Sequence, residues 1–477
     1  MRSRLWLPTL ILSENSVSKK FLESAARHGY ATAPVKTTRM PPGIPFIVGN
    51  EAAERFSFYG MRAILVVFMT KYLMNAAGQP APMSEIDAKI YYHIFVSAVY
   101  FLPLLGALVA DAFWGKYRTV MTLSLVYCAG HAALAINDTR TGLFVGLGLI
   151  SLGAGGIKPC VSAIVGDQFG PSNQHLIPRV FSWFYFSINF GSFFSILLIP
   201  VILDNRTPFS GPHFAFAVPG VFMLIATIVF WVGRKRFVQI PPGGARVIAE
   251  IFTRENLKVI ARLYVLFVFV AVFWSLYDQS SSAWVLQAEK MDRHWLGYEW
   301  DAAQLQAINP LLILVMIPIF SYGIYPAVNK LFPLDPLRKM SIGLFVMVPS
   351  FIITAWIESQ ISRGLHPNIV WQCVAYVFLT AAEVLVSITS LEFSYTQAPL
   401  RLKSFIMSLY LTSVTLGDLF VAGVNEFIKL FKNPDGTLKL QGAAYYWFFT
   451  DIMVVTAVIF IFVARVFPVR NIVPDEA

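Results

Sequence analysis

Cysteine and charged side chains are both scarce in this chain of 477 residues. Its three cysteines, Cys128, Cys160 and Cys373, all fall inside apolar stretches, so the sequence predicts neither a disulfide framework nor a metal site. Charged residues make up 13% of the chain and hydrophobic residues 56%. No loop has the residue spacing of a nucleotide-binding or zinc-binding motif. These absences argue against a catalytic domain, and we expect no enzymatic activity, no cofactor and no metal.

Long apolar runs dominate what is present, and the mean hydropathy is +0.62. Most of the runs hold about 18–25 residues, enough to cross a hydrocarbon core roughly 30 Å thick. The sequence therefore predicts an all-α membrane protein with 12 transmembrane helices. The expected spans are residues 52–73, 91–113, 119–136, 143–166, 180–203, 213–233, 259–284, 303–328, 338–357, 369–391, 404–428 and 444–467.

The formal net charge of +10 is distributed unevenly along the chain. If both termini are cytoplasmic, most Lys and Arg residues outside the spans fall in cytoplasmic segments, such as Arg234-Lys235-Arg236 and Arg338-Lys339. Because positive charge is enriched on the cytoplasmic side of membrane proteins, this pattern predicts cytoplasmic termini. We therefore expect a multi-pass protein of the plasma (inner) membrane. Its basic residues reflect its orientation in the lipid bilayer, which is its expected partner, and do not indicate binding to nucleic acid.

A polar, basic stretch containing Pro241-Pro242-Gly243-Gly244 divides the spans into two groups of six. Two six-span halves suggest the major facilitator architecture, in which rocking of the halves exposes a central site alternately to each side. The expected parts are a cytoplasmic N-terminal extension (1–45), an N-terminal six-helix bundle (46–233), a cytoplasmic linker (234–258), a C-terminal six-helix bundle (259–468) and a cytoplasmic tail (469–477).

The connection between the second and third spans carries Asp111, Lys116 and Arg118 after a helix end that contains Gly106. Small residues allow membrane helices to pack closely, so charges beside such a helix end could hold two helices in one arrangement. We interpret these three residues as a gate. An ordinary charged loop is the alternative.

Four charges lie at the start of an otherwise apolar span. At about 100° per residue, Glu51, Glu54, Arg55 and Arg62 share one helix face with Tyr59. Ionisable groups inside a spanning helix are costly and normally face a water-filled cavity or a partner charge. The face therefore indicates a substrate or proton pathway, with an interfacial helix turn as the alternative.

Few other polar side chains fall at membrane depth. Lys158, Asp278 and Glu383 would each cost about 2.5 kcal/mol or more if they were unpaired at mid-membrane. Acids and bases gathered in one place can take up a proton, which favours proton-coupled movement over a simple pore. His93 could add a group that titrates near neutral pH, although a structural role is equally compatible with the sequence.

Several blocks of the chain resemble the proton-coupled oligopeptide transporter (POT/PTR) family. His93, Asp278 and the last of these blocks are more similar to the animal-type carriers than to most bacterial ones. In family order, the blocks are Glu51-Ala-Ala-Glu54-Arg55-Phe-Ser-Phe-Tyr-Gly60, Ala110-Asp111 with Gly115-Lys116, Gly155-Gly156-Ile157-Lys158-Pro159, Phe184-Tyr185 with Ile188-Asn189-Phe190-Gly191, Phe273-Trp274-Ser275-Leu276-Tyr277-Asp278-Gln279, Asn309-Pro310, Glu383, and Leu391-Glu392-Phe393-Ser394-Tyr395-Thr396-Gln397-Ala398-Pro399.

The resemblance implies separate residues for the proton and for the substrate. Arg62 would pair with the carboxylate of a peptide and Glu383 with its amine, since a short zwitterion needs a fixed cation and a fixed anion on opposite walls. A salt bridge between the first-span charges and Lys158 would open and re-form during the cycle. The implied proton-coupling residues are Glu51, Glu54, Arg55, Lys158, Asp278 and His93. The implied substrate-binding residues are Arg62, Tyr59, Tyr100, Lys158, Asn189, Trp274, Asn309, Glu383 and Ser404.

Some positions depart from the family's pattern. Phe58 stands where the family usually has Tyr, and Tyr410 stands where Trp is more common. Ser321 lies where animal-type members can carry an acid, so the partner of Arg262 is left open. The resemblance implies no role for Asp418, for which a structural hydrogen bond is expected.

We therefore expect a proton-coupled symporter that imports di- and tripeptides by alternating access. A transporter of nitrate or another small metabolite on the same fold is the alternative, but an anion without an amine has no use for Glu383. A receptor that keeps the fold without transport is a third possibility, and no loop suggests a signalling domain.

Overall fold

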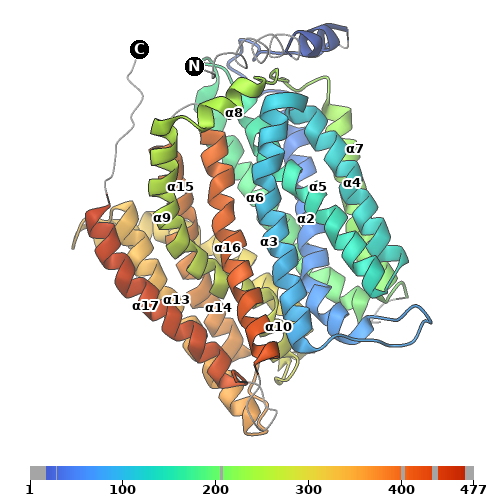
Figure 1. Ribbon diagram of the computed structural model, residues 1–477, viewed down its shortest axis with the longest axis vertical. Helices are drawn as coiled ribbons and strands as arrows, with labels where there is room; N and C mark the ends of the chain where they lie inside the picture. The colour runs from blue at the N-terminus through green and yellow to red at the C-terminus, as the bar shows by residue number, and fades with distance from the viewer. Residues whose placement is uncertain (1–17, 28, 205–207, 399–402, 432–438, 468–477) are drawn as a thin grey trace, which may run out of the picture.

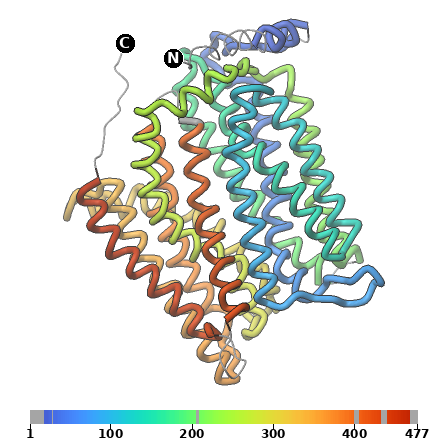
Figure 2. Tube along the Cα trace, in the orientation of Figure 1, coloured from blue at the N-terminus to red at the C-terminus, as the bar shows by residue number. Residues whose placement is uncertain are grey.

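Two groups of long helices lie side by side in the protein (Figure 1). The computed structural model describes residues 18–27, 29–204, 208–398, 403–431 and 439–467, apart from the side chains of 403 and 404. The Cα trace in Figure 2 shows that the first part of the chain forms one group and the second part forms the other. The expected tail at 469–477 lies outside the described residues.

The first group, called the N-half below, is formed by residues 44–233. Ser84 and Thr139 begin two of its helices, because their side chains accept backbone N–H groups of the first turn. The helices are α2 (Ile44–Val67), α3 (Glu85–Val109), α4 (Lys116–Ile136), α5 (Arg140–Asp167), α6 (Ile177–Leu203) and α7 (Pro212–Gly233), with the π-helical turns η1 (Phe68–Tyr72) and η2 (Ala110–Trp114) after α2 and α3 and the 3-10 turn η3 (Gln174–Leu176) before α6.

The second group, called the C-half below, follows the short helix α8 (Ala245–Ile251). Thr253 and Asp335 cap α9 and α13 in the same way. Its elements are α9 (Arg254–Tyr277), η4 (Asp278–Ser281), α10 (Ala283–Ala288), the antiparallel hairpin of β1 (His294–Trp295) and β2 (Tyr298–Glu299), η5 (Ala302–Ala307), α11 (Ile308–Pro318), η6 (Ile319–Ile324), α12 (Tyr325–Asn329), α13 (Pro336–Ser362), α14 (Val370–Glu383), η7 (Val384–Ile388), α15 (Thr389–Gln397), α16 (Lys403–Leu430) and α17 (Ala443–Val466).

Eleven helical stretches of the described chain are long and apolar enough to cross a membrane, by length and composition. They correspond to the second through twelfth expected spans. The first expected span is α2, which is also long but carries the charged face. Some helices extend beyond the expected boundaries: α2 begins at Ile44 and α9 at Arg254, because the apolar core of a span does not mark where its helix is capped.

The two halves meet where α3 lies beside α16 (Figure 1). Ser97 Oγ donates to the carbonyl of Thr415 at 3.3 Å, and Thr415 Oγ1 donates to the carbonyl of Ser97 at 3.2 Å. On its other side α3 packs tightly on α5. A Cβ on Gly106 would lie 2.5 Å from the Cα of Gly156, so this approach requires glycine.

The N-terminal extension lies over one end of the N-half. Residues 18–27 are helical, and the buried Phe21 ring packs against Gly115. Farther along, the backbone N–H of Gln239 donates to the carbonyl of Ala31 at 2.8 Å. We call this end of the molecule the α8 face, because it also carries α8 (Figure 1), and the opposite end, at α10 and the hairpin, the hairpin face.

Among the residues that the structure describes, three ion pairs join the halves at the hairpin face. Lys71 at the end of η1 pairs with Glu289. On α3, Glu85 pairs with Lys290 at 2.9 Å and Asp87 pairs with Lys429 at 2.7 Å. We call these pairs the hairpin-face clamp, listing them as Lys71–Glu289, Glu85–Lys290 and Asp87–Lys429.

Candidate functional site

A cavity of about 160 Å³ lies between the two halves. Helices α2 and α6 form its wall in the N-half, and η4, η5, α11 and α14 contribute most of its wall in the C-half. Four of its polar side chains are Arg62, Asn189, Asn309 and Glu383. The full lining is Tyr59, Arg62, Tyr185, Ile188, Asn189, Ser192, Ile196, Tyr277, Ser280, Ser281, Gln306, Asn309, Pro310, Tyr376 and Glu383.

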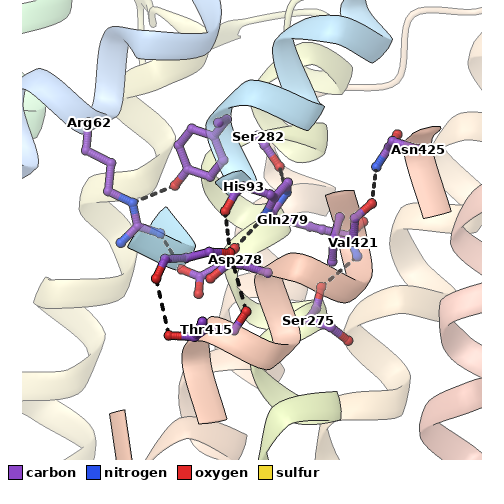
Figure 3. Close-up of polar contacts among 12 residues, drawn as sticks. Arg62, His93, Ser275, Asp278, Gln279, Ser282, Thr415, Val421 and Asn425 are labelled. Atoms are coloured by element: carbon purple, nitrogen blue, oxygen red, sulfur yellow. Dashed lines mark hydrogen bonds and ion pairs between the residues drawn. The ribbon is translucent and has the colours of Figure 1, made fainter. Parts of the chain in front are cut away.

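Arg62 is the cation of this cavity. It is buried in α2, forms an ion pair with Asp278 and donates through Nε to the Tyr92 hydroxyl at 2.5 Å (Figure 3). Asp278 lies where α9 ends and the chain tightens into the 3-10 turn η4. The charge pair therefore crosses from one half to the other, and its desolvation is offset by the pairing.

Glu383 is the acid of the same cavity, on the opposite half. Its Oε2 accepts from Asn309 Nδ2 at 2.7 Å, and the Tyr277 hydroxyl donates to Asn309 Oδ1 at 3.1 Å. The helix changes at this point, because the π-helical turn η7 begins at Val384. Single π-helical turns in helices are frequent at functional sites, where they alter the direction of side chains.

The first turn of the charged face lies farther from Arg62 along α2. Arg55 Nε contacts Glu51 Oε1 at 2.6 Å and Glu54 Oε2 at 3.3 Å. The expected salt bridge to Lys158 is open: Lys158 Nζ is buried without a hydrogen-bond partner among the described residues. It lies 4.1 Å from the ring centre of Phe58 and 4.3 Å from that of Tyr100, so two aromatic faces hold the ammonium group.

His93 joins the halves on the hairpin side of Ser97. Its ring is fully buried, with Nδ1 2.5 Å from Asp418 Oδ1 and Nε2 2.9 Å from the Ser282 hydroxyl (Figure 3). The hydrogen bond expected for Asp418 is present, and its partner is this ionisable ring. The sequence did not connect the two residues, because they lie on helices of different halves.

The three residues interpreted as a gate all lie at the α8 face. Lys116 Nζ pairs with Asp167 at the end of α5 at 2.7 Å. Arg118 Nη2 donates to the Ser24 hydroxyl at 3.0 Å, so it holds the N-terminal extension. The carbonyl of Asp111 accepts from Gly243 N at 2.8 Å, which ties the connection to the linker.

Some expected site residues lie away from the cavity lining. Tyr100 contacts Lys158, and Trp274 packs edge-on against Tyr277, 5.1 Å between ring centres. The side chain of Ser404 lies outside the described residues. Of the departures from the family pattern, the Tyr410 hydroxyl lies 2.9 Å from that of Ser390. Arg262 lies 5.8 Å from the ring centre of Phe467.

Other residues of the site were not singled out from the sequence. They are Tyr92, which binds Arg62, Asp167, which binds Lys116, and the cavity residue Tyr376. Gln306 Nε2 donates to the carbonyl of Ala63 at 3.1 Å and so connects η5 to α2. The polar character of these residues was visible, but a single Tyr or Gln in a span is more often a structural hydrogen-bonding residue than part of a site.

A family model described as the POT family matches residues 117–254 and 245–448. The chain belongs to the POT family. The resemblance seen in the sequence blocks is thereby confirmed. Members of this family are transporters, not enzymes, and the predominantly helical architecture of this POT-family chain is that of a multi-pass membrane protein.

Curated relatives include animal peptide carriers. The chain is 35% identical to Peptide transporter family 1 of Drosophila melanogaster over 369 residues, which cover 68% of this chain and 49% of the relative. It is 34% identical to Solute carrier family 15 member 2 of Rattus norvegicus over 398 residues, covering 74% and 53%. This POT-family chain therefore spans about half the length of the curated relatives it matches.

Solved POT-family structures match the fold along nearly their whole length. An auto-inhibited POT family peptide transporter aligns with a TM-score of 0.80 at 36% identity, covering 91% of this chain and 99% of the other. The POT family transporter PepTSo aligns with a TM-score of 0.81 at 36% identity, covering 90% and 99%. The expected major facilitator fold is thus confirmed.

Proposed function

We propose that this chain is a proton-coupled symporter that imports di- and tripeptides by alternating access. The observation that carries the proposal is that Arg62 and Glu383 line one cavity from opposite halves. A peptide carries a carboxylate at one end and an amine at the other, and these two side chains supply the complementary charges. The names of the relatives, several of them peptide transporters, support the same substrate class.

The peptide carboxylate would exchange with Asp278 as the partner of Arg62, and the amine would bind Glu383. Asn189 and Asn309 would hydrogen-bond the peptide backbone, because each lines the cavity with an amide. Tyr59 and the other aromatic residues would contact variable side chains, since apolar aromatic walls tolerate many shapes. We keep Tyr100, Lys158, Trp274 and Ser404 as expected contacts of a more open state.

Glu51, Glu54 and Arg55 would couple the proton to Lys158. In the structure the Lys158 ammonium group lies over the rings of Phe58 and Tyr100, while Arg55 pairs with the carboxylates of Glu51 and Glu54. If a carboxylate takes up a proton, its hold on Arg55 weakens and the charge balance around Lys158 changes. A Lys158 that moves between the aromatic rings and a carboxylate would connect protonation to the shape of the N-half.

In this proposal the α8 face is cytoplasmic and the hairpin face is outside, at the plasma membrane. The hairpin-face clamp would then hold the outside shut, and Asp111, Lys116 and Arg118 would act at the cytoplasmic side. We retain the proposed 12 spans, with α2 as the first, and the division at 46–233 and 259–468 with both termini cytoplasmic. Peptide, protons and the lipid bilayer are the expected partners.

Uptake into proteoliposomes tests the function directly. With the interior more alkaline than the exterior, labelled dialanine should accumulate above its outside concentration, and an uncoupler should abolish the accumulation. Failure of several dipeptides to accumulate, with nitrate moving instead, would overturn the proposal.

The amine site can be tested with a matched pair of peptides. Glu383→Gln should weaken competition by a dipeptide with a free amine by roughly tenfold or more, because a charge-assisted hydrogen bond is worth about 1.5–3 kcal/mol. An N-acetylated dipeptide should lose far less. Glu255→Gln, which removes an exposed acid at the start of α9, is the control and should change neither. Equal losses for both peptides would contradict the assignment.

A further inference from the structure

We propose that Asp418 and Asp278 share one proton where the two halves meet, and that this proton keeps the hairpin face closed. Only one part of this inference, the use of the proton in transport, rests on the proposed function. The carboxyl groups of Asp418 and Asp278 interact directly within the group of residues that His93 and Arg62 complete, and two carboxyl groups that share one buried site do not both ionise readily. Nothing in the family resemblance assigns a role to Asp418.

Each carboxylate has one oxygen that is satisfied and one that is not. Asp418 Oδ1 is bound to His93, and Asp278 Oδ1 is bound to Arg62. The Oδ2 atoms of both residues are buried and have no hydrogen-bond donor among the described residues. A proton placed between the two carboxyl groups gives these oxygens the donor that a buried polar atom requires.

The net charge of the four ionisable side chains, Arg62, His93, Asp278 and Asp418, also indicates one bound proton. Arg62 supplies one positive charge, two ionised carboxylates supply two negative charges, and His93 can bind both of its partners as a neutral ring. The sum is one negative charge, with Asp418 completely buried and Asp278 nearly so. Because an uncompensated charge in such a place is costly, one bound proton is favoured.

Other ionisable groups surround the two acids. Glu383, a further acid, and the hydroxyls of Tyr100 and Tyr277 lie within electrostatic range of Asp278, and none of them adds a positive charge that could replace the proton. Tyr92 and Lys89 on α3 lie within electrostatic range of Asp418 and of His93, respectively. Lys89 is directed toward the Tyr445 ring, 4.2 Å from its centre. Of the remaining helices packed on α16, α5 carries Lys158, which lies over aromatic rings, and α15 carries Glu392, which lies near Tyr325.

The position of the cluster connects the proton to the contact between the halves. Arg62 and His93 belong to the N-half and Asp278 to the C-half (Figure 3). Asp418 lies on α16 and so also belongs to the C-half. The Ser97–Thr415 hydrogen bonds lie one turn away on the same pair of helices. When the halves are together the side chains of the cluster are buried, and the proton offsets their excess negative charge. When they separate, water can solvate both carboxylates, so the separated form holds the proton less tightly.

The sign of the pH dependence follows from this difference. A proton that binds the closed form more tightly stabilises closure at low pH, and the stabilisation is lost as the pH rises through the titration of the closed form. Closure of the hairpin face would trap a proton taken up from the outside. Release of that proton toward the central cavity would remove the stabilisation of the closed form, so the hairpin face could reopen. Release has a short path, because Arg62, the partner of Asp278, lines that cavity.

Distances between the halves test the inference without any peptide. Spin labels at exposed positions, Ala77→Cys in the N-half and Leu365→Cys in the C-half, would report separation at the hairpin face in a background without the native cysteines. In the otherwise native chain, the ratio of short to long distances should fall by up to about tenfold per pH unit as the proton is lost.

Removal of either acid should flatten this response. With Asp418→Asn or Asp278→Asn the cluster is neutral without a bound proton, so the ratio should change by less than about twofold per pH unit. Asp418→Glu keeps the acid and should keep a pH response. A native response in the folded Asp418→Asn protein would overturn the inference, as would its loss in Asp418→Glu.

If Asp418→Asn fails to fold, a native response in Asp278→Asn overturns it equally. If the distances respond as expected but no peptide is transported, the proposed substrate fails and the proton site stands.

Discussion

At the scale of single residues, Phe58 shows how an apolar substitution can serve a charge. From the sequence it was only a missing hydroxyl on the charged face of α2. In the structure its ring is completely buried and lies 4.1 Å from Lys158 Nζ. A buried ammonium group with no hydrogen-bond partner in the described part of the chain can be held by aromatic faces, so Phe58 stabilises the open arrangement of the expected salt bridge.

Replacement of the ring should therefore impair coupling. We expect Phe58→Leu to lower proton-driven uptake by roughly 2- to 30-fold, because a cation–π contact is worth about 0.5 to 2 kcal/mol depending on desolvation. Phe58→Tyr retains the ring and is the matched control. The measurement is the initial uptake rate under a fixed pH gradient, with thermal melting to confirm folding. Identical rates for the leucine variant and the native protein would exclude this role.

The sequence identified most charged members of the site but not how they pair. Arg62 and Glu383 were predictable because ionisable groups inside apolar spans are rare and functional. Their partners were not, since Tyr92 and Asp278 approach Arg62 from separate helices, one of them in the other half. The pairing of His93 with Asp418 was hidden for the same reason. Pairing depends on helix rotation and depth, which one sequence does not determine.

At the scale of secondary-structure elements, the packing of α3 on α5 depends on glycine. The cores of the helices were predictable from apolar length, but the π-helical turn after Glu383 and the 3-10 turn at Asp278 were not. These irregular turns result from packing between helices and leave no periodic signal in the sequence. The contact of Gly106 with Gly156 is an exception, because small residues in a span already suggested close approach.

Gly106→Ala should destabilise the protein, although alanine favours helix formation. The added Cβ would lie 2.5 Å from Gly156 Cα and 2.9 Å from the Gly155 carbonyl, and backbone atoms cannot rotate away. Overpacking of this kind costs about 1–3 kcal/mol. Gly148→Ala on α5 is the matched control, because a Cβ there meets nothing within 4 Å, and it should not lower stability. Thermal unfolding in detergent would compare the two, and equal melting temperatures would contradict the packing argument.

At the scale of the whole molecule, the hairpin-face clamp holds one arrangement of the halves. The order of the helices and the division into halves followed from apolar runs and the polar linker. The clamp could not be predicted, because each of its pairs joins residues that are distant in sequence and belong to different halves. Each of its partly exposed pairs stabilises the closed form by only about 0.2–1 kcal/mol, but all three act on the same equilibrium between the closed and open hairpin face.

Removal of the clamp should expose the cavity from the hairpin face. We expect the combined variant Glu85→Gln, Asp87→Asn and Glu289→Gln to raise the open fraction by roughly 3- to 150-fold, the effect of about 0.6–3 kcal/mol. A cysteine replacing the buried cavity residue Ser192 would report this through its rate of modification by a membrane-impermeant maleimide. Glu299→Gln, which breaks the Arg293–Glu299 pair within the C-half, is the control and should leave the rate unchanged. An unchanged rate in the combined variant would show that the clamp does not hold the halves.

The central cavity has a further consequence, which follows from its volume of about 160 Å³. At about 30 Å³ per water molecule in the liquid, it has room for roughly five waters. A dipeptide with two large side chains contains several times that many heavy atoms, so it cannot enter unless the two walls draw apart. A bulky side chain would then act as a wedge, and discrimination by size would come from how far the halves yield and not from the outline of a rigid pocket.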